Sequence, residues 1–160
     1  CTQGYPMRIT LRDGKTVEVP QTTLVGAYLP SINLQDADLN GIRAVRANLF
    51  WGIFAHTDLS DANFNDAILA EADFHVTHAT QCRFQRATLA DATLTAGWFH
   101  QADFSGAILY GADVSCADFT EAMLCGADMR CQNLHDAILT DVIYDAHTLW
   151  PDGFDIHEHI

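Results

Sequence analysis

Large apolar residues recur along this chain at every fifth position. Starting at Thr22, the sequence divides into 25 consecutive pentads that end at Ala146 without an insertion. Twenty of the 25 third positions are Leu or Phe, and 15 of the 25 first positions are Ala. An α-helix repeats every 3.6 residues and a β-strand every two, so neither element alone produces this spacing. The pattern therefore predicts a corner of the backbone in every pentad.

A squared coil is the simplest shape that has such corners. If each pentad forms one side, the first and third residues point inward and the other three point outward. Four sides make a coil of about 20 residues, and successive coils stack at the spacing of hydrogen-bonded strands, about 4.8 Å. Eleven second positions are Asp or Asn, whose short side chains can bond to nearby backbone groups.

The best-matched pentads are Ala37-Asp38-Leu39-Asn40-Gly41 and Ala102-Asp103-Phe104-Ser105-Gly106. They follow the order small residue, Asp or Asn, Leu or Phe, polar residue, Gly, and the chain thereby resembles the pentapeptide-repeat family. The resemblance implies an all-β fold, a right-handed quadrilateral β-helix of about six coils over residues 22–146. Departures from the pattern predict local bulges or packing defects, at the enlarged first positions Ile32, Ile42, Gln132 and Val142 and at the small third positions Ala44 and Ala79.

Both ends of the chain are expected to be caps, which a solenoid needs to cover its terminal coils. In residues 1–21, Met7 to Leu11 and Lys15 to Val19 alternate apolar and polar residues about Asp13-Gly14, which predicts a two-residue β-hairpin turn. In residues 147–160, Trp150 and Phe154 are expected to close the other end. The last five residues, from Ile156 on, are expected to form a loose tail.

The charge of the chain is strongly acidic, with 8 Lys and Arg against 21 Asp and Glu, a formal net charge of −13. This balance argues against direct binding of nucleic acid. No apolar run approaches the roughly 18 to 20 residues of a membrane-spanning helix. The sequence therefore predicts a folded protein with an acidic surface.

Five cysteines, an odd number without paired spacing, predict free thiols. We expect Cys82 to be a small buried residue, and Cys116, Cys125 and Cys131 to point outward. Free thiols favour a cytoplasmic location. The thylakoid lumen, the periplasm and a lipoprotein anchored through Cys1 remain alternatives.

No catalytic, cofactor-binding or metal site is predicted. Gly14-Lys15-Thr16 resembles the end of a phosphate-binding loop, but that motif needs a glycine where Ile9 stands. The histidine pairs His75 and His78, and His157 and His159, have no third ligand at a suitable spacing. We therefore expect a protein that is not an enzyme.

The arginines are the most informative outward residues. Arg43 and Arg83, like Arg46 and Arg86, are separated by eight pentads, which places all four on one side of the coil, two coils apart. Asp66 falls midway between Arg46 and Arg86, so a structural ladder of alternating charges is one interpretation. The fourth side, counted from the pentad that begins at Thr22, carries no Lys or Arg. Its outward residues include the carboxylates Asp38, Asp58, Asp61, Asp118, Glu121 and Asp141.

Exposed aromatic residues suggest the other interpretation, a binding surface. Phe50 and Trp51 take outward places in the pentad after Arg46, and Trp98 takes one elsewhere. Trp and Arg are enriched among residues that dominate binding energy. The candidate partner-binding surface is therefore Arg43, Arg46, Phe50, Trp51, Arg83, Arg86 and Trp98.

Three functions are compatible with these features. The first is a monomeric, rigid, non-enzymatic module that binds an unidentified protein partner. The second, implied by the family resemblance and the acidic charge, is a DNA mimic that acts on DNA gyrase or topoisomerase. The third is a purely structural or stress-related protein. We favour the first, because relatives that mimic DNA have a dimerising C-terminal helical segment, and this sequence shows none.

Overall fold

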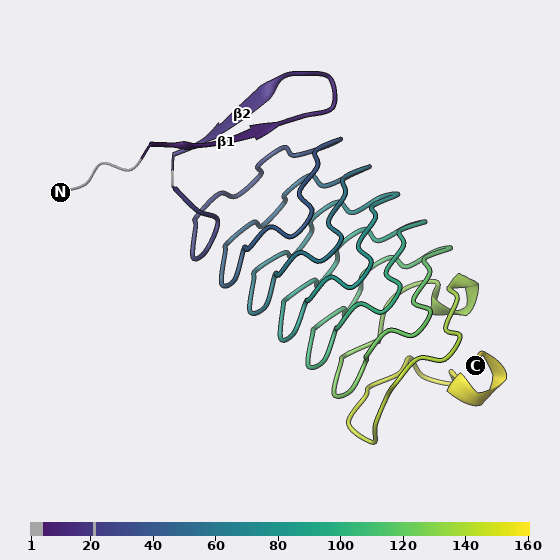
Figure 1. Ribbon diagram of the computed structural model, residues 1–160. Coiled ribbons are helices and arrows are strands. Elements are labelled where there is room, and N and C mark those ends of the chain that lie inside the picture. Colours follow the sequence, from purple (N-terminus) through teal and green to yellow (C-terminus); the bar gives the residue numbers. More distant parts are fainter. Residues whose placement is uncertain (1–4, 21) are drawn as a thin grey trace.

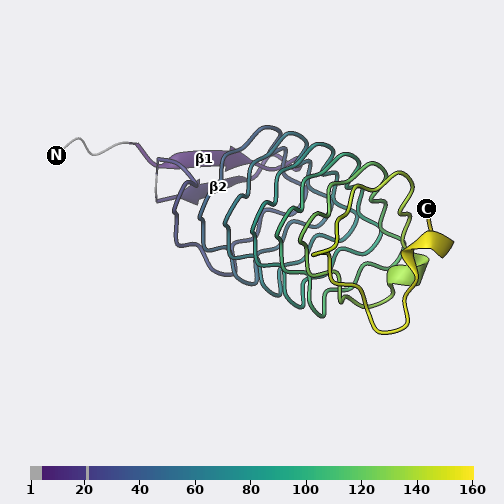
Figure 2. The same ribbon diagram turned by 90° about the horizontal axis from the view of Figure 1, so that it is seen from below.

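The computed structural model describes residues 5–20 and 22–160. The coils stack into an elongated rod, with a β-hairpin at one end and two short 3₁₀ helices at the other (Figures 1 and 2). The hairpin consists of β1 (Met7–Thr10) and β2 (Thr16–Val19). The 3₁₀ helices are η1 (Leu134–Asp136) and η2 (Ile156–Glu158). The described residues contain no α-helix.

Second-position residues join the coils through four ladders of parallel bridges. Each regular step along a ladder advances the chain by four pentads, as from Arg43 to Asn63. We name each ladder after its first residue. They are the Tyr28 ladder (28, 48, 68, 88, 108, 128, 149), the Asn33 ladder (33, 53, 73, 93, 113, 132), the Asp38 ladder (38, 58, 78, 98, 118, 138) and the Arg43 ladder (43, 63, 83, 103, 123, 143).

The corners are tight turns with one unusual backbone conformation. All 21 fifth-position residues from Gly26 to Gly126 have positive φ, and 16 of them are not glycine. The third-position carbonyl accepts the next first-position N–H, as in the 2.8 Å bond from Gly52 to Leu49. Positive φ at the third residue of such a turn is typical of type II turns. The fifth-position N–H also bonds to the next coil, so stacking holds the left-handed conformation in place; the Ser31 N–H donates to the Phe50 carbonyl at 2.7 Å.

The second-position carboxylates and amides brace these turns. Ten of the eleven Asp and Asn residues there accept the backbone N–H two residues later, and the Asp73 carboxylate accepts from His75 at 2.9 Å. This confirms the predicted bonding to nearby backbone. The exception is Asn133, which lies where the repeat is interrupted.

The core is the axis of the rod. All third-position residues except Leu29 and Tyr144 are buried, which confirms the predicted inward register. Phenylalanines stack between coils, with Phe84 4.9 Å from Phe104 and 5.6 Å from Phe64 between ring centroids. The first positions beside them are mostly alanine, because little space remains next to the rings.

The hairpin turn differs from the prediction. The Leu11 N–H donates to the Lys15 carbonyl, and the Gly14 N–H donates to the Leu11 carbonyl. The connection is therefore a three-residue loop, Arg12 to Gly14, rather than a two-residue turn. Gly14 has φ of 82°, the left-handed conformation that ends such loops.

The repeat is interrupted near its C-terminal end, at one of the enlarged first positions that predicted a local bulge or packing defect. Gln132 pairs with Asp113, one position short of the regular step, and η1 follows. Cys131 is buried at 8% exposure, so the prediction that it points outward is wrong. The slip turns the small Cys131 inward and leaves the Gln132 amide outside, which avoids burying a polar group in the apolar core.

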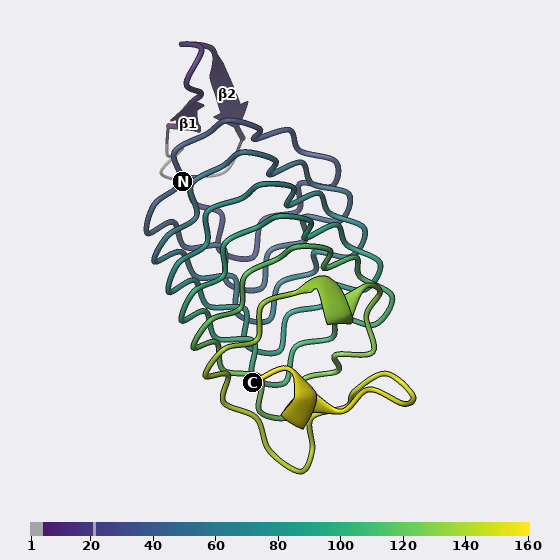
Figure 3. The same cartoon turned by 90° about the vertical axis from the view of Figure 1, so that its right-hand side faces the viewer.

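The C-terminal segment agrees with expectation only in part. Trp150 and Phe154 are partly buried and pack against the core, with ring centroids 5.7 Å apart. Ile156 is buried and begins η2, so the last residues do not form a loose tail (Figure 3). The Asp155 side chain accepts the His157 N–H and stabilises this turn. Burial of the Ile156 side chain explains why the segment is ordered.

Candidate functional site

The four predicted arginines lie where the repeat places them. Arg43 and Arg83 belong to the Arg43 ladder, with Asn63 between them. Arg46 and Arg86 occupy fifth positions of the same pentads. Arg43 and Arg83, together with Gly41, Asp61 and Asn63, line a surface depression of about 380 Å³.

Only one half of the predicted charge ladder forms. Arg86 donates two hydrogen bonds to the Asp66 carboxylate, from Nε at 2.8 Å and from the terminal nitrogen at 3.0 Å. The hydrogen bond from Arg86 lowers the pKa of Asp66 below its ordinary value. Arg46 has no ion pair within 4.0 Å among the described residues. Arg46 is therefore an exposed cation whose charge is available to a partner.

Phe50 and Trp51 form an aromatic pair on the next side of the rod. Their ring centroids are 4.4 Å apart. The Trp51 indole N–H donates to the Glu71 carboxylate in the next coil at 2.7 Å. The Trp51 residue still has 52% of its surface exposed. Trp51 thus has a structural role, because Phe50 and Glu71 on its own side of the rod hold its ring in place. About half of the residue nevertheless remains accessible to a partner.

Trp98 lies on a different side of the rod from the other six predicted residues. It belongs to the Asp38 ladder, and its ring lies edge-on to His78 at 3.9 Å between centroids. The next residue of that ladder is Asp118, whose carboxylate contacts His100 Nε2 at 2.6 Å. Burial raises the pKa of Asp118, but hydrogen bonds from Thr120 and His100 outweigh it, so the net pKa is lowered. Trp98 therefore lies between His78 and Asp118, on the side of the rod that also carries Asp38 and Asp58.

The sequence reasoning missed several exposed apolar residues. Tyr28, Ile68 and Ile108 take alternate places in the Tyr28 ladder, and Tyr110 lies two residues beyond Ile108. All four are exposed and share the side of Phe50. The spacing of two coils between the first three was visible in the sequence and could have revealed this apolar column.

The cysteines differ in their surroundings. Burial raises the pKa of Cys131 to about 12 and raises the pKa of Cys82 well above its ordinary value. Cys116 is exposed, and no disulfide joins Cys82, Cys116, Cys125 and Cys131. Cys1 lies outside the described residues. The two buried thiols are therefore protonated and inert near neutral pH.

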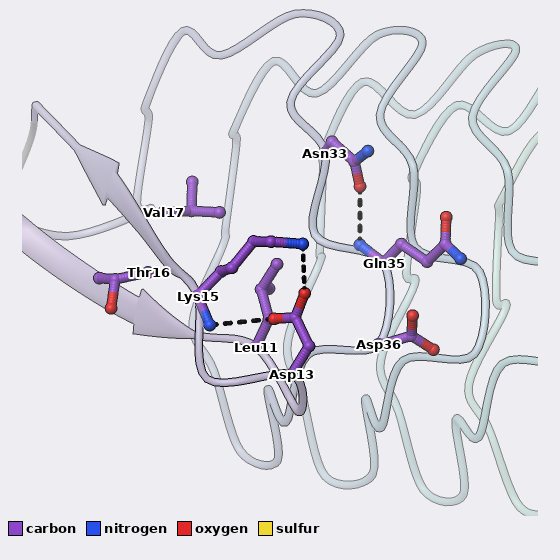
Figure 4. Close-up of a pocket in the computed structure, with 8 residues that line it drawn as sticks. All are labelled: Leu11, Asp13, Lys15, Thr16, Val17, Asn33, Gln35 and Asp36. Carbon is purple, nitrogen blue, oxygen red and sulfur yellow. Dashed lines mark hydrogen bonds and ion pairs between the residues drawn. The ribbon is translucent and has the colours of Figure 1, made fainter.

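A second cavity, of about 430 Å³, lies between the hairpin and the first coil. Leu11, Asp13, Lys15, Thr16 and Val17 line it on the hairpin side, and Asn33, Gln35 and Asp36 on the coil side (Figure 4). The Lys15 ammonium contacts the Asp13 carboxylate at 2.6 Å.

Two kinds of feature are absent from the described residues, 5–20 and 22–160. No group of three His, Cys, Asp or Glu residues there could hold a metal ion. No helix in this part of the chain is long and apolar enough to cross a membrane.

The sequence profile of pentapeptide repeats matches the chain in eight copies, over residues 57–95, 67–106, 88–122 and 102–142. These segments together span 57–142, more than half of the 160 residues. The chain belongs to the pentapeptide-repeat family. The resemblance inferred from the pentads is therefore confirmed, and the protein is a β-helical solenoid of that family. No curated protein sequence matches this pentapeptide-repeat protein.

Solved structures of other pentapeptide-repeat proteins are similar to this one. Alr5209 from Nostoc PCC 7120 is 28% identical, with a TM-score of 0.50, over 61% of this chain and 80% of its own. HetL from Nostoc sp. strain PCC 7120, a protein involved in heterocyst differentiation regulation, is 23% identical with a TM-score of 0.43, and the match covers 75% of this chain. This pentapeptide-repeat protein spans only about half of HetL, 53% of its length. AT2G44920 from the Arabidopsis thaliana thylakoid lumen is 24% identical with a TM-score of 0.47, over 66% of this chain and 67% of its own.

Proposed function

We propose that this protein is a rigid, right-handed quadrilateral solenoid of about six coils that serves as a non-enzymatic protein–protein interaction module. The observation that carries the proposal is the half-exposed Trp51 ring, fixed by Glu71 and Phe50. The exposed Arg46 precedes it by one pentad, across a corner of the coil. The partner is a protein with an acidic, partly apolar surface.

Preorganisation favours binding through this corner. A side chain that is already immobile loses little conformational entropy when a partner covers it. Trp and Arg also dominate the binding energy of many interfaces. Arg43, Arg83 and Arg86 complete the proposed surface, and Trp98 is a separate candidate contact on another side of the rod. We propose that the protein is a monomer. We also propose a cytoplasmic location, because Cys82, Cys116, Cys125 and Cys131 are all free thiols.

A pair of double variants tests this proposal. Trp51→Ala with Arg46→Glu removes the ring and reverses the charge, whereas Trp51→Phe with Arg46→Lys retains both chemistries. Tagged protein of each kind is used to capture the partner from the native source. We expect the first variant to lose the partner and the second to retain it, with melting temperatures that stay close to that of the parent. Equal capture by both variants would contradict the proposal.

A DNA mimic acting on gyrase or topoisomerase is the second candidate, and the net charge of −13 favours it. The acidic side carries Asp58, Asp61 and Asp118, but Arg43 and Arg83 lie on the side that follows it. A supercoiling assay separates the two candidates. We expect weak, salt-sensitive effects on gyrase, and potent inhibition at submicromolar protein would reverse the ranking.

A further inference from the structure

The first coil has an open backbone edge along the Asn33 ladder. The N–H and carbonyl of Asn33 and the carbonyl of Gln35 have no hydrogen-bond partner among the described residues. One coil later, each equivalent group is paired. The Ile53 N–H donates to the Ile32 carbonyl at 2.8 Å, the Ile53 carbonyl accepts from Leu34 at 2.8 Å, and the Ala55 carbonyl accepts from Asp36 at 3.1 Å. The first coil therefore offers one donor and two acceptors in ladder geometry.

The hairpin leaves this edge uncovered. Its contact with the coil is at the neighbouring corner, where Leu11 pairs with Ala37 and the Arg12 N–H donates to the Asp36 carbonyl at 3.1 Å. The cavity of about 430 Å³ separates the hairpin from Asn33 and Gln35 (Figure 4). The unpaired edge thus borders a cleft whose other wall is the hairpin.

An exposed strand edge is normally blunted by proline or charge, because it can pair with another chain. The neighbouring open edge, in the Tyr28 ladder, carries Pro30 two residues after Tyr28. The Asn33 edge carries Leu34 and Gln35 instead, so no proline lies within it, and the nearest charge along the chain is that of Asp36. Among the first-coil edges, this one is best suited to accept a strand.

We propose that this cleft binds an extended segment of a partner protein, which adds a strand to the Asn33 ladder. The added strand accepts the Asn33 N–H and donates to the carbonyls of Asn33 and Gln35, as strand addition does at other sheet edges. The half-buried side chains of Leu11 and Val17 offer an apolar contact from the hairpin side.

The charges of the cleft select the sequence of that segment. The Asp13 carboxylate already holds Lys15, while Asp36 has no ion pair among the described residues. A Lys or Arg of the partner therefore complements Asp36. Alternate residues of a strand point to opposite faces, so the expected partner alternates basic residues with β-branched apolar ones.

The first experiment uses a defined peptide as the probe. It is a heptapeptide of alternating Lys and Val with blocked ends, and its control is the same peptide with an N-methyl group on every backbone amide. Amide exchange and chemical shifts of ¹⁵N-labelled protein are recorded with each peptide. We expect the unmethylated peptide to slow exchange of the Asn33 amide at least tenfold and to shift Lys15, Gln35 and Asp36. The methylated peptide has the same charge but lacks donors, so we expect it to do neither.

Paired variants test the same contacts from the protein side. Both Asn33→Pro and Asn33→Ala remove the side-chain oxygen that accepts the Gln35 N–H. Only Asn33→Pro also removes the backbone N–H at the edge. We expect at least tenfold weaker peptide binding for the proline variant than for the alanine variant. Should the proline variant fail to fold, Asp36→Lys is compared with Asp141→Lys, an equal charge change at a fifth position far from the cleft. Only Asp36→Lys is expected to weaken binding, by at least fivefold.

Three results would overturn the proposal. Equal binding of the two peptides, or equal effects of the two lysine variants, would reveal general attraction to an acidic protein. Protection of the Asn33 amide that rises with protein concentration in the absence of peptide would identify a second copy of this chain as the occupant.

Discussion

Truncation of Phe84 tests the packing of the axis most directly. Its side chain is fully buried, with stacked rings on both sides at 5.6 Å (Phe64) and 4.9 Å (Phe104). Two more rings meet it edge-on, Phe74 at 5.9 Å and Phe99 at 6.3 Å. Buried Phe→Ala changes cost about 3–5 kcal/mol, and each aromatic pair adds about 0.5–1.5 kcal/mol beyond its buried area. With four ring neighbours, we expect Phe84→Ala to lower the free energy of unfolding by about 4–5 kcal/mol.

Urea unfolding followed by circular dichroism measures this change. A loss of that size lowers the melting temperature by roughly 8–20 °C in a chain of this length. Phe84→Leu is the matched control, because Leu124 fills the same place two coils further along. We expect that control to cost about 1–1.5 kcal/mol. A loss below about 2 kcal/mol for Phe84→Ala, or equal losses for both variants, would refute a closely packed axis.

Three further predictions concern other parts of the rod. A β-carbon added at Gly97 would lie 2.5 Å from the Phe99 ring, so we expect Gly97→Ala to lower the free energy of unfolding by about 1–3 kcal/mol; an unchanged urea midpoint would show that the ring moves freely. Buried Cys131 should react with a thiol reagent only after denaturation, whereas exposed Cys116 should react in the folded protein. Fast labelling of Cys131 in the folded protein would show that its side chain points outward after all. The pKa of Asp118 is lower in the folded protein than in the unfolded chain. The ionised Asp118 carboxylate therefore stabilises the fold at pH values above its unfolded pKa of about 4, and this stabilisation is lost as the pH falls through the folded pKa. Asp118→Asn should therefore reduce the loss of melting temperature between pH 4 and 2, and an unaltered pH profile would contradict this assignment.

The sequence alone was sufficient to assign the family, the inward register and the role of the second-position carboxylates. In a solenoid each coil contacts only its neighbours, so a fixed sequence offset corresponds to a fixed spatial neighbour. This is why Arg43 and Arg83, two coils apart, could be assigned to one side in advance. The same rule also places Tyr28, Ile68 and Ile108 in one exposed column, which our interpretation of the sequence overlooked.

Tertiary structure decided whatever a fixed offset does not specify. Asp66 lies one coil from both Arg46 and Arg86 but binds only Arg86, because side-chain geometry rather than spacing selects the partner. The enlarged first position Gln132 predicted a local bulge or packing defect, but only the structure shows its form, a one-residue slip that turns Cys131 inward and keeps the Gln132 amide outside. The cleft beside Asn33 and the burial of Ile156 arise at the ends, where no neighbouring coil repeats and the chain packs against whatever surface is left uncovered.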